Sequence, residues 1–238
     1  MFVAVVILVI IGVDELFRAL ARVNTDFTKW VGYSASLLFV GFTYYFGEAI
    51  LPKVFVLVLF IALINYVLEF PRLSFAGLGV NLFISIYLGC FFSFAFLLRQ
   101  LEHGFFFLFL AFLLAWATDI GAYVSGTLWG KHKLAATLSP NKTWEGAFGG
   151  LFLAMVTSVF AFLFVPVGAT LLDAAVLGLL ASSMGQIGDL SASAIKRQTG
   201  IKDFGSILPG HGGVMDRFDS FLLVAPMVYY YLGLFIIN

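Results

Sequence analysis

The side chains best suited to chemistry are concentrated in residues 188–220 of this 238-residue chain. They include the carboxylates of Asp189, Asp216 and Asp219. Asp216 and Asp219 are three residues apart, so they would share one face of a helix. Together with Asp189 they could surround one hard cation, and an all-oxygen ligand set favours magnesium over zinc.

Positive charge and glycine accompany these carboxylates. Lys196, Arg197 and Arg217 are suited to phosphate oxygens, and five glycines within residues 200–213 would let the backbone approach a ligand closely. Ordinary salt bridges could explain any one pair of charges. The whole combination favours a metal-dependent phosphate site, in which His211 is expected to be a hydrogen-bonded loop residue and not a base.

A second cluster lies in residues 139–146. Pro140 could begin a helix, and Asn141 or Thr143 could cap its exposed amide groups. A helix N-terminus beside a lysine is a natural phosphate site, so Lys142 is a candidate phosphate ligand. The glycine spacing of a nucleotide-binding P-loop is missing from this sequence.

Asp119 lies in an apolar stretch of the sequence, where a charged side chain costs about 2.5–3.5 kcal/mol to insert into a membrane. Two interpretations stay open. The carboxylate is either near a helix end and reaches cytoplasmic water, or it is a ligand or charge anchor at the floor of a cytoplasmic cavity. Its position alone does not separate the two.

The elements that must position these residues are membrane helices. The chain is 62% hydrophobic and 11% charged, whereas soluble domains are about 45–50% apolar and about 25% charged. Because a spanning helix needs about 20 apolar residues, the sequence predicts an all-α polytopic membrane protein with about eight transmembrane helices. The predicted spans are 1–20, 31–47, 54–69, 76–98, 104–125, 145–166, 172–188 and 219–237. Residues 1–110 would form N-terminal membrane helices, and residues 111–238 a C-terminal region that carries the chemistry.

The basic residues fit this segmentation if the chain starts outside the cell. Eleven of the 13 Lys and Arg residues then lie in cytoplasmic loops, and only Lys53 and Arg99 lie outside. This bias agrees with the positive-inside rule and places residues 126–144 and 189–218 in the cytoplasm. Lys131 and Lys133 are expected mainly to hold this topology.

The overall charge and the first span add further limits. Thirteen basic and thirteen acidic residues leave no net charge, so nucleic-acid binding by phosphate neutralisation is not expected. Cys90 is expected to be a packed, inert thiol. Only thirteen residues precede Asp14 and Glu15, so either these acids point into the bundle or the chain lacks upstream sequence.

Three blocks together have the pattern of a known family. Residues 193–219 read Ser193-x-Ile195-Lys196-Arg197-x4-Lys202-Asp203-x-Gly205-x2-Leu208-Pro209-x-His211-Gly212-Gly213-Val214-x-Asp216-Arg217-Phe218-Asp219. The other blocks are Ser139-Pro140-x-Lys142-Thr143-Trp144-Glu145-Gly146, and Asp119 with Ala122-Tyr123. All three resemble phosphatidate cytidylyltransferase, also called CDP-diacylglycerol synthase, and the first looks like the full signature of that family. The resemblance covers essentially the whole back half of the chain.

This resemblance implies an enzyme that converts CTP and phosphatidic acid to CDP-diacylglycerol and pyrophosphate with Mg²⁺ and possibly a second cation. Asp189 and Asp216 would hold the metal, with Asp219 as a ligand or supporting partner. The other implied roles are neutralisation of the triphosphate or lipid head group by Lys142, Lys196 and Arg197, orientation of a ligand or cation by Asp119, and a place in the site for Ser193. The resemblance also implies a homodimer in the cell (inner) membrane, with the active site facing the cytoplasm.

Two departures from the family pattern stand out. Family members generally carry an additional N-terminal helix, and this chain is expected to begin inside what would be their second helix. Many relatives also have a glutamate three positions after the equivalent of Asp189, where this chain has Ala192.

Other functions remain as alternatives. One is a CTP-dependent transferase that acts on another lipid phosphate, such as a polyprenol or an archaeal ether lipid, and another is a non-catalytic scaffold. A transporter is disfavoured because the charges gather at one face and no inverted repeat is visible. A CDP-alcohol phosphotransferase is excluded because its Asp-Gly-x2-Ala-Arg motif is absent from the sequence.

Overall fold

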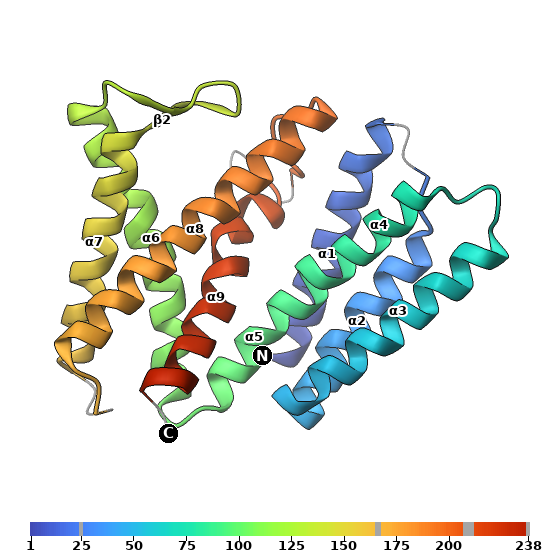
Figure 1. Ribbon diagram of the computed structural model, residues 1–238, viewed down its shortest axis with the longest axis horizontal. Helices are drawn as coiled ribbons and strands as arrows, with labels where there is room; N and C mark the ends of the chain where they lie inside the picture. Colours follow the sequence, from blue (N-terminus) through green and yellow to red (C-terminus); the bar gives the residue numbers. More distant parts are fainter. Residues whose placement is uncertain (24–25, 165–167, 207–211, 237–238) are drawn as a thin grey trace. The chain divides into compact units, whose positions relative to one another are not determined.

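A computed structural model describes residues 1–23, 26–164, 168–206 and 212–236, which are helical apart from short connections and one β-hairpin (Figure 1). The long helices in chain order are α1 (Phe2–Leu20), α2 (Lys29–Phe46), α3 (Leu51–Leu68), α4 (Phe75–Ile84), α5 (Phe91–Gln100), α6 (Gly104–Trp129), α7 (Trp144–Phe162), α8 (Leu171–Thr199) and α9 (Met215–Phe235). Short helical segments are η1 (Ala21–Val23), η2 (Glu48–Ile50) and the π-helix η3 (Ser85–Cys90), which joins α4 to α5. Strands β1 (Lys133–Ala135) and β2 (Ser139–Thr143) pair antiparallel.

Six helical segments within the described residues are long and apolar enough to cross a membrane, which confirms the predicted polytopic all-α membrane protein. They are Glu48–Leu68, Phe75–Gln100, Gly104–Trp129, Trp144–Phe162, Leu171–Thr199 and Met215–Phe235. The predicted spans 1–20 and 31–47 also form helices, α1 and α2, but these are not among the six. Three charged side chains lie in α1, and the first half of α2 is rich in small and hydroxyl-bearing residues.

The chain forms two compact units, and each unit consists of two separate stretches of the sequence. Unit 1 contains Met1–Gln100 and Ile195–Phe218, and unit 2 contains Leu101–Ala194 and Asp219–Asn238. Both α8 and α9 therefore contribute residues to each unit. The predicted organisation into residues 1–110 and 111–238 stays a prediction.

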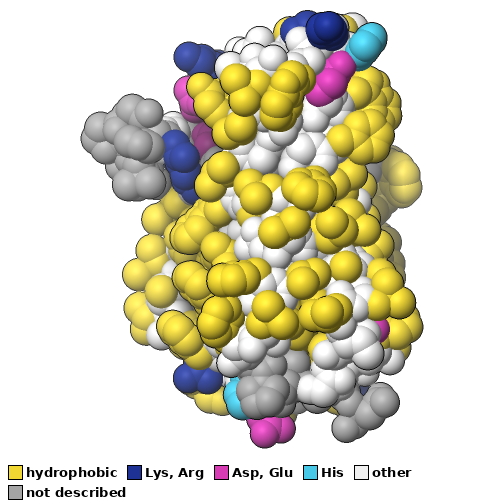
Figure 2. Space-filling view, turned by 90° about the vertical axis from the view of Figure 1, so that its left-hand side faces the viewer, with side chains coloured by type: hydrophobic (Ala, Val, Ile, Leu, Met, Phe, Trp, Pro, Cys, Tyr) yellow, Lys and Arg dark blue, Asp and Glu magenta, His cyan; other side chains and the backbone are white. Residues whose placement is uncertain are grey.

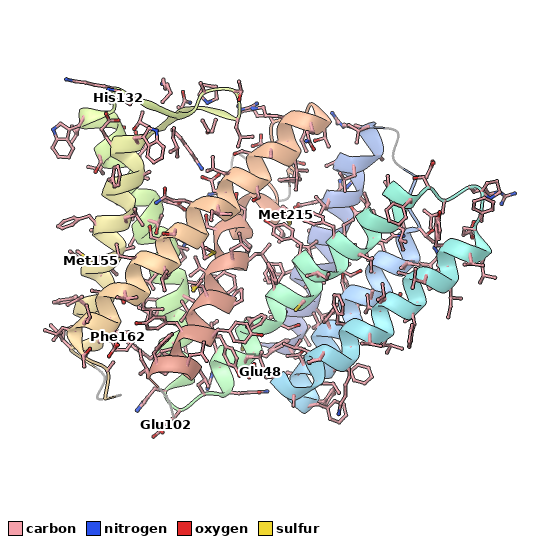
Figure 3. All side chains as sticks on the ribbon, viewed as in Figure 1. Glu48, Glu102, His132, Met155, Phe162 and Met215 are labelled. Atoms are coloured by element: carbon pink, nitrogen blue, oxygen red, sulfur yellow. The ribbon has the colours of Figure 1, made fainter. Side chains whose placement is uncertain are left out.

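The surface of unit 2 has the pattern of a membrane protein. Hydrophobic side chains cover the middle of the face shown in Figure 2, and the charged side chains lie at its two ends. His132 and Glu102 lie at opposite ends of the helices of this unit, with Met155 between them (Figure 3). The connections after α5 and after α6 therefore lie at opposite ends, as successive membrane spans require.

In unit 1, α2 packs closely against α1 and η3. The ring of Phe17 lies directly against Gly32, and the backbone of Ser36 lies directly against Gly89 of η3. A side chain at either glycine would overlap these atoms. Small residues at helix contacts are typical of membrane bundles, because they let the backbones approach closely.

Unit 2 is packed in the same manner. Gly121 of α6 lies against the backbone of Gly149 of α7, and Gly178 of α8 lies against the backbone of Met155. The rings of Phe112 and Phe221 stack with their centroids 4.0 Å apart, which joins α9 to α6. These contacts hold α6, α7 and α8 close together. Side chains at the ends of these helices that are predicted to face the cytoplasm can therefore line one site.

One predicted boundary is wrong in a way that matters for function. The span predicted to end at residue 188 continues as α8 to Thr199, so Asp189, Ser193 and Lys196 lie on a helix and not in a loop. The polar residues that end the apolar run are good helix formers or are tolerated on an exposed helix face. Hydropathy alone therefore marks where the membrane stretch ends, not where the helix ends.

Candidate active site

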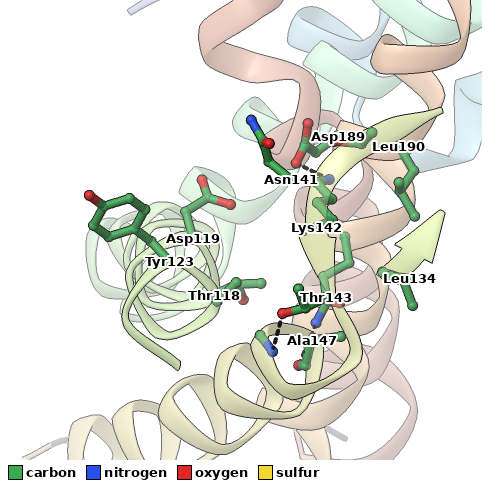
Figure 4. A pocket seen from close by; sticks show the side chains of 14 residues that line it. Thr118, Asp119, Tyr123, Leu134, Asn141, Lys142, Thr143, Ala147, Asp189 and Leu190 are labelled. Carbon is green, nitrogen blue, oxygen red and sulfur yellow. Dashed lines mark hydrogen bonds and ion pairs between the residues drawn. The ribbon is translucent and has the colours of Figure 1, made fainter. Parts of the chain in front are cut away.

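A cavity of about 370 Å³ lies in unit 2 between α6, α7, α8 and the β-hairpin (Figure 4). Its volume is within the range of about 300–1,000 Å³ that small-molecule sites occupy. Polar and apolar side chains both line it, and the polar ones come from α6, the hairpin and α8. The lining residues are Thr118, Asp119, Ala122, Tyr123, Leu134, Ser139, Asn141, Lys142, Thr143, Gly146, Ala147, Gln186, Asp189 and Leu190.

The hairpin is fixed to the start of α7, which determines where Lys142 lies. The hydroxyl of Thr143 accepts a hydrogen bond from the amide of Gly146 at 3.1 Å and so caps the helix. The amide of Trp144 donates to the carbonyl of His132 at 2.9 Å, across the base of the hairpin. The predicted cap at Thr143 is confirmed, but the predicted helix start at Pro140 is wrong because that residue lies in β2.

Lys142 of β2 and Asp189 of α8 form an ion pair at this cavity. Their side chains are 25% and 32% exposed, so both still face space that a ligand could enter. Figure 4 shows the Asp119 carboxylate on the α6 side of the cavity, opposite Asn141 and Lys142. Asp119 therefore lies at a cavity, and its role as a ligand or charge anchor stays a prediction.

Gln186 is a lining residue that sequence reasoning did not find. Its side-chain nitrogen donates to the carbonyl of Ala147 at 3.1 Å and to the hydroxyl of Ser182 at 3.4 Å. The bond to Ala147 joins α8 to α7, and the bond to Ser182 lies within α8. The available signal was an amide side chain within an otherwise apolar stretch of a membrane span, where polar groups usually have a partner.

Ser193 lies one helical turn beyond Asp189 on α8 and is half-buried. Residues four apart lie on the same face of a helix, so Ser193 continues the face that carries Asp189. It is not among the residues that line the cavity. Its assignment to the site stays a prediction.

In unit 1, Asp216 is the centre of a hydrogen-bonded turn. Its Oδ2 accepts the amides of Phe204 at 2.8 Å and Gly213 at 3.0 Å, and its Oδ1 pairs with the Lys196 ammonium at 2.9 Å. The two side chains of this pair are only 9% and 17% exposed. His211, predicted to be a hydrogen-bonded loop residue, lies outside the described residues.

The two cations of α8 differ in their surroundings. The Lys196 ammonium also lies 5.5 Å from the centre of the Phe204 ring, a cation–π distance that favours a fixed position. Arg197 is exposed. Sequence analysis gave both residues the same role, and the structure adds that Lys196 forms an ion pair with Asp216.

Asp219 belongs to unit 2 and is 9% exposed. Its backbone lies against Gly188 of α8, and its Oδ1 accepts the amide of Ser220 at 2.7 Å. The neighbouring glycine allows α9 to approach α8 one residue before Asp189. Asp219 therefore lies beside the helix segment that carries the ion pair.

The oxygen donors at the cavity fit a magnesium ion. Asp119, Asp189 and the carboxamide of Asn141 line one space, and Mg²⁺ commonly takes one or two carboxylates while keeping several waters. Asp216 is different, because both its oxygens already accept hydrogen bonds. Among the described residues, no three His, Cys, Asp or Glu side chains are gathered as a metal site. The predicted ligand set of Asp189, Asp216 and Asp219 stays a prediction.

Comparison with known proteins gives the chain a clear set of relatives. The sequence model of the cytidylyltransferase family matches residues 1–235. Phosphatidate cytidylyltransferases of Staphylococcus saprophyticus subsp. saprophyticus and Staphylococcus aureus are 42% identical to it over 169 residues, which are 71% of this chain and 64% of each relative. The Staphylococcus haemolyticus protein of the same name is 41% identical over the same shares. The chain thus matches somewhat less than two thirds of the length of these curated relatives.

Proposed function

This chain belongs to the cytidylyltransferase family, and we propose that it is a phosphatidate cytidylyltransferase, a nucleotidyltransferase of phospholipid biosynthesis. It would convert CTP and phosphatidic acid to CDP-diacylglycerol and pyrophosphate. Support comes from the relatives named above and from the match of residues 193–219 to the signature of that enzyme. The observation that carries the proposal is the cavity at which Asp119, Lys142 and Asp189 meet beside the N-terminus of α7.

The reaction is a displacement at phosphorus. A phosphate oxygen of phosphatidic acid forms a bond to the α-phosphorus of CTP, while the bond from that phosphorus to the oxygen bridging to the β-phosphate breaks. The bonding electron pair leaves with pyrophosphate. Because the attacking oxygen already carries negative charge, the protein needs no general base, and its main tasks are positioning and charge neutralisation.

The cavity residues can perform these tasks. The Lys142 ammonium provides positive charge at one wall for phosphate oxygens, and the N-terminal end of the α7 dipole lies beside it. Asp119 and Asp189 would hold magnesium, which when bound neutralises phosphate charge and polarises the α-phosphorus. When the ion is bound, Lys142 would release Asp189 and turn to the triphosphate. Ser193 and Asp219 are proposed to support the α8 segment that carries Asp189.

The basic and acidic residues of the signature in unit 1 would handle further phosphate charge. We propose that Lys196 and exposed Arg197 neutralise the triphosphate or the lipid head group. Asp216 would keep Lys196 in place through their ion pair and could contribute to metal binding. The number of metal ions, including a second cation, is part of this proposal.

The proposed enzyme lies in the cell (inner) membrane, where the protein crosses the bilayer several times. Its site would face the cytoplasm, because CTP is cytosolic and because the basic residues of the sequence lie mostly on that predicted side. Phosphatidic acid would enter from the lipid. A homodimer is proposed on the family resemblance alone.

The test is incorporation of labelled CTP into chloroform-extractable lipid by the purified protein in detergent, with phosphatidic acid and magnesium. Lys142→Met should abolish product, whereas the matched control Lys131→Met, an exposed lysine just before the same hairpin, should retain it. Omission of magnesium should abolish product in all samples. A folded wild-type protein that makes no CDP-lipid contradicts the proposal, and product with a polyprenol phosphate but not with phosphatidic acid would assign another acceptor.

A further inference from the structure

Glu15 is a buried acid that contacts the signature, although the two are about 200 residues apart in the sequence. It lies on α1 and is 0% exposed. Its neighbour Asp14 is different, because it is 41% exposed and pairs with Arg18 at 2.7 Å. Asp14 also accepts a hydrogen bond from the Tyr33 hydroxyl of α2 at 3.2 Å, but of the two acids only Glu15 is fully enclosed.

Both carboxylate oxygens of Glu15 hold the first turn of α9. Oε1 accepts the amide of Val214 at 3.1 Å, and Oε2 accepts the amide of Met215 at 2.9 Å. Amides at the start of a helix have no acceptor within the helix, and a negative charge at this end is favourable. Glu15 therefore caps α9 from a different helix.

Two glycines of the signature fit around this carboxylate. A Cβ atom at Gly205 or at Gly213 would overlap the carboxylate of Glu15. The sequence alone attributes the glycines of this segment to close approach of a ligand. At these two positions the structure gives another reason, since the group that approaches closely is an acid of the protein itself.

Glu15 and Asp216 act on successive amides of one turn. Asp216 accepts the amide of Gly213, and Glu15 accepts the next two, those of Val214 and Met215. A shift of the Glu15 carboxylate would therefore move the turn from which Asp216 projects. Asp216 would carry that shift to Lys196 through their ion pair.

A carboxylate is a costly way to hold two helices together. Burying its charge is unfavourable unless hydrogen bonds compensate, and apolar side chains could join α1 to α9 at lower cost. What the carboxylate adds is direction, because its two oxygens fix two amides at defined positions. This is the property that a phosphate-binding turn needs.

We propose that Glu15 is a positioning residue for cytidylyl transfer, which sets the placement of Asp216 and Lys196 by holding the start of α9. The proposal rests on the proposed function for its effect on catalysis. Glu15 is 0% exposed and both its oxygens accept backbone amides, so it acts through the signature and not on the substrates.

The experiment compares Glu15→Gln, Glu15→Asp and the matched control Asp14→Asn, the same kind of change one residue away on α1. The glutamine of Glu15→Gln keeps one acceptor but turns an NH2 donor toward a backbone N–H. We expect kcat to fall on the order of tenfold to a hundredfold, with a smaller change in KM for CTP. Glu15→Asp, which keeps the charge, should recover part of kcat, and Asp14→Asn should match wild type.

Hydrogen exchange supplies a readout that does not depend on activity. The amides of residues 212–216 should exchange faster in Glu15→Gln than in wild type, and at the wild-type rate in Asp14→Asn. If Glu15→Gln does not fold, Gly205→Ala replaces it, because the added Cβ displaces the carboxylate while Glu15 is kept. Its control is Gly79→Ala in α4, where a Cβ meets nothing within 4 Å.

The outcomes separate this proposal from the proposed function. Unchanged kcat in folded Glu15→Gln, or a lower unfolding temperature with unchanged kcat and KM, overturns the positioning role. If wild-type protein forms no CDP-lipid, the proposed function fails, and the exchange measurement alone decides whether Glu15 holds the signature. Unchanged exchange at residues 212–216 overturns that role as well.

Discussion

In unit 2 the acids Asp119 and Asp189 face a cavity, whereas in unit 1 the acids Glu15 and Asp216 are enclosed by backbone amides. The side chain of Asp189 is 32% exposed and that of Asp216 is 9% exposed. An acid that faces open space can still bind a ligand. An acid whose oxygens already accept hydrogen bonds acts first on the chain around it.

This contrast assigns different roles to the two groups of acids. The cavity acids are suited to contact substrates and metal, and the enclosed acids are suited to hold the glycine-containing segment in shape. Each group should therefore respond differently to the same Asp→Asn change. Activity and stability together can show whether the division is correct.

The largest expected effect is that of Asp189→Asn on activity. We expect a loss of about 10²–10³-fold in kcat, the size typical for removing one group that stabilises transition-state charge. The unfolding temperature in detergent should change little, because partly exposed ion pairs contribute only about 0–1 kcal/mol. Formation of CDP-lipid and thermal unfolding are measured on the same preparation.

The matched control for this variant is Asp173→Asn, near the other end of α8. Asp173 accepts hydrogen bonds from Thr170 and has no place at the cavity. Its replacement should leave kcat unchanged. Normal activity in Asp189→Asn, or a loss of stability without a loss of activity, would contradict the different roles proposed for the cavity acids and the enclosed acids.

Asp216→Asn should instead lower stability and activity together. It removes charge from an acceptor of two amides and of Lys196, and hydrogen bonds to charged groups contribute about 1.5–3 kcal/mol each. We expect a clear fall in unfolding temperature and faster hydrogen exchange at Phe204 and Gly213. Asp189→Asn should change neither quantity.

The control here is Asp203→Asn, an exposed acid in the same segment. It should leave the unfolding temperature at the wild-type value. If Asp216→Asn proves as stable as Asp203→Asn and loses only activity, then Asp216 behaves like a cavity acid. In that case the predicted metal ligand set, with Asp216 as a member, regains support.

The membrane architecture could be predicted from sequence because apolar length is a strong and local signal. All eight predicted spans correspond to helices within the described residues, although six of them meet the length and hydropathy of a membrane span. The end of α8 could not be predicted in this way, since the helix continues past its apolar stretch to Thr199. Gly200, at φ 67°, ends the helix directly after Thr199.

The sequence named candidate site residues but not how they are paired. Sequence patterns pointed to Lys142, Asp189 and Asp216, and the structure adds that Lys142 pairs with Asp189 while Lys196 pairs with Asp216. The contact of Glu15 with Met215 joins residues 200 positions apart. No local periodicity reports such a pair, and the only sign of it was an acid within an apolar stretch.

The smallest expected effect tests how firmly the cavity wall depends on its helix cap. Thr143→Ala removes the hydroxyl that accepts the Gly146 amide and should cost about 0.5–2 kcal/mol of stability. KM for CTP should rise modestly, because α7 begins beside Lys142, while kcat should change less than in Asp189→Asn. Thr143→Ser keeps the hydroxyl and should stay close to wild type in both measurements. Equal losses in the two variants would assign the effect to the position of the Thr143 methyl group, which packs near Gly130. The helix cap would then not be what holds the cavity wall in place.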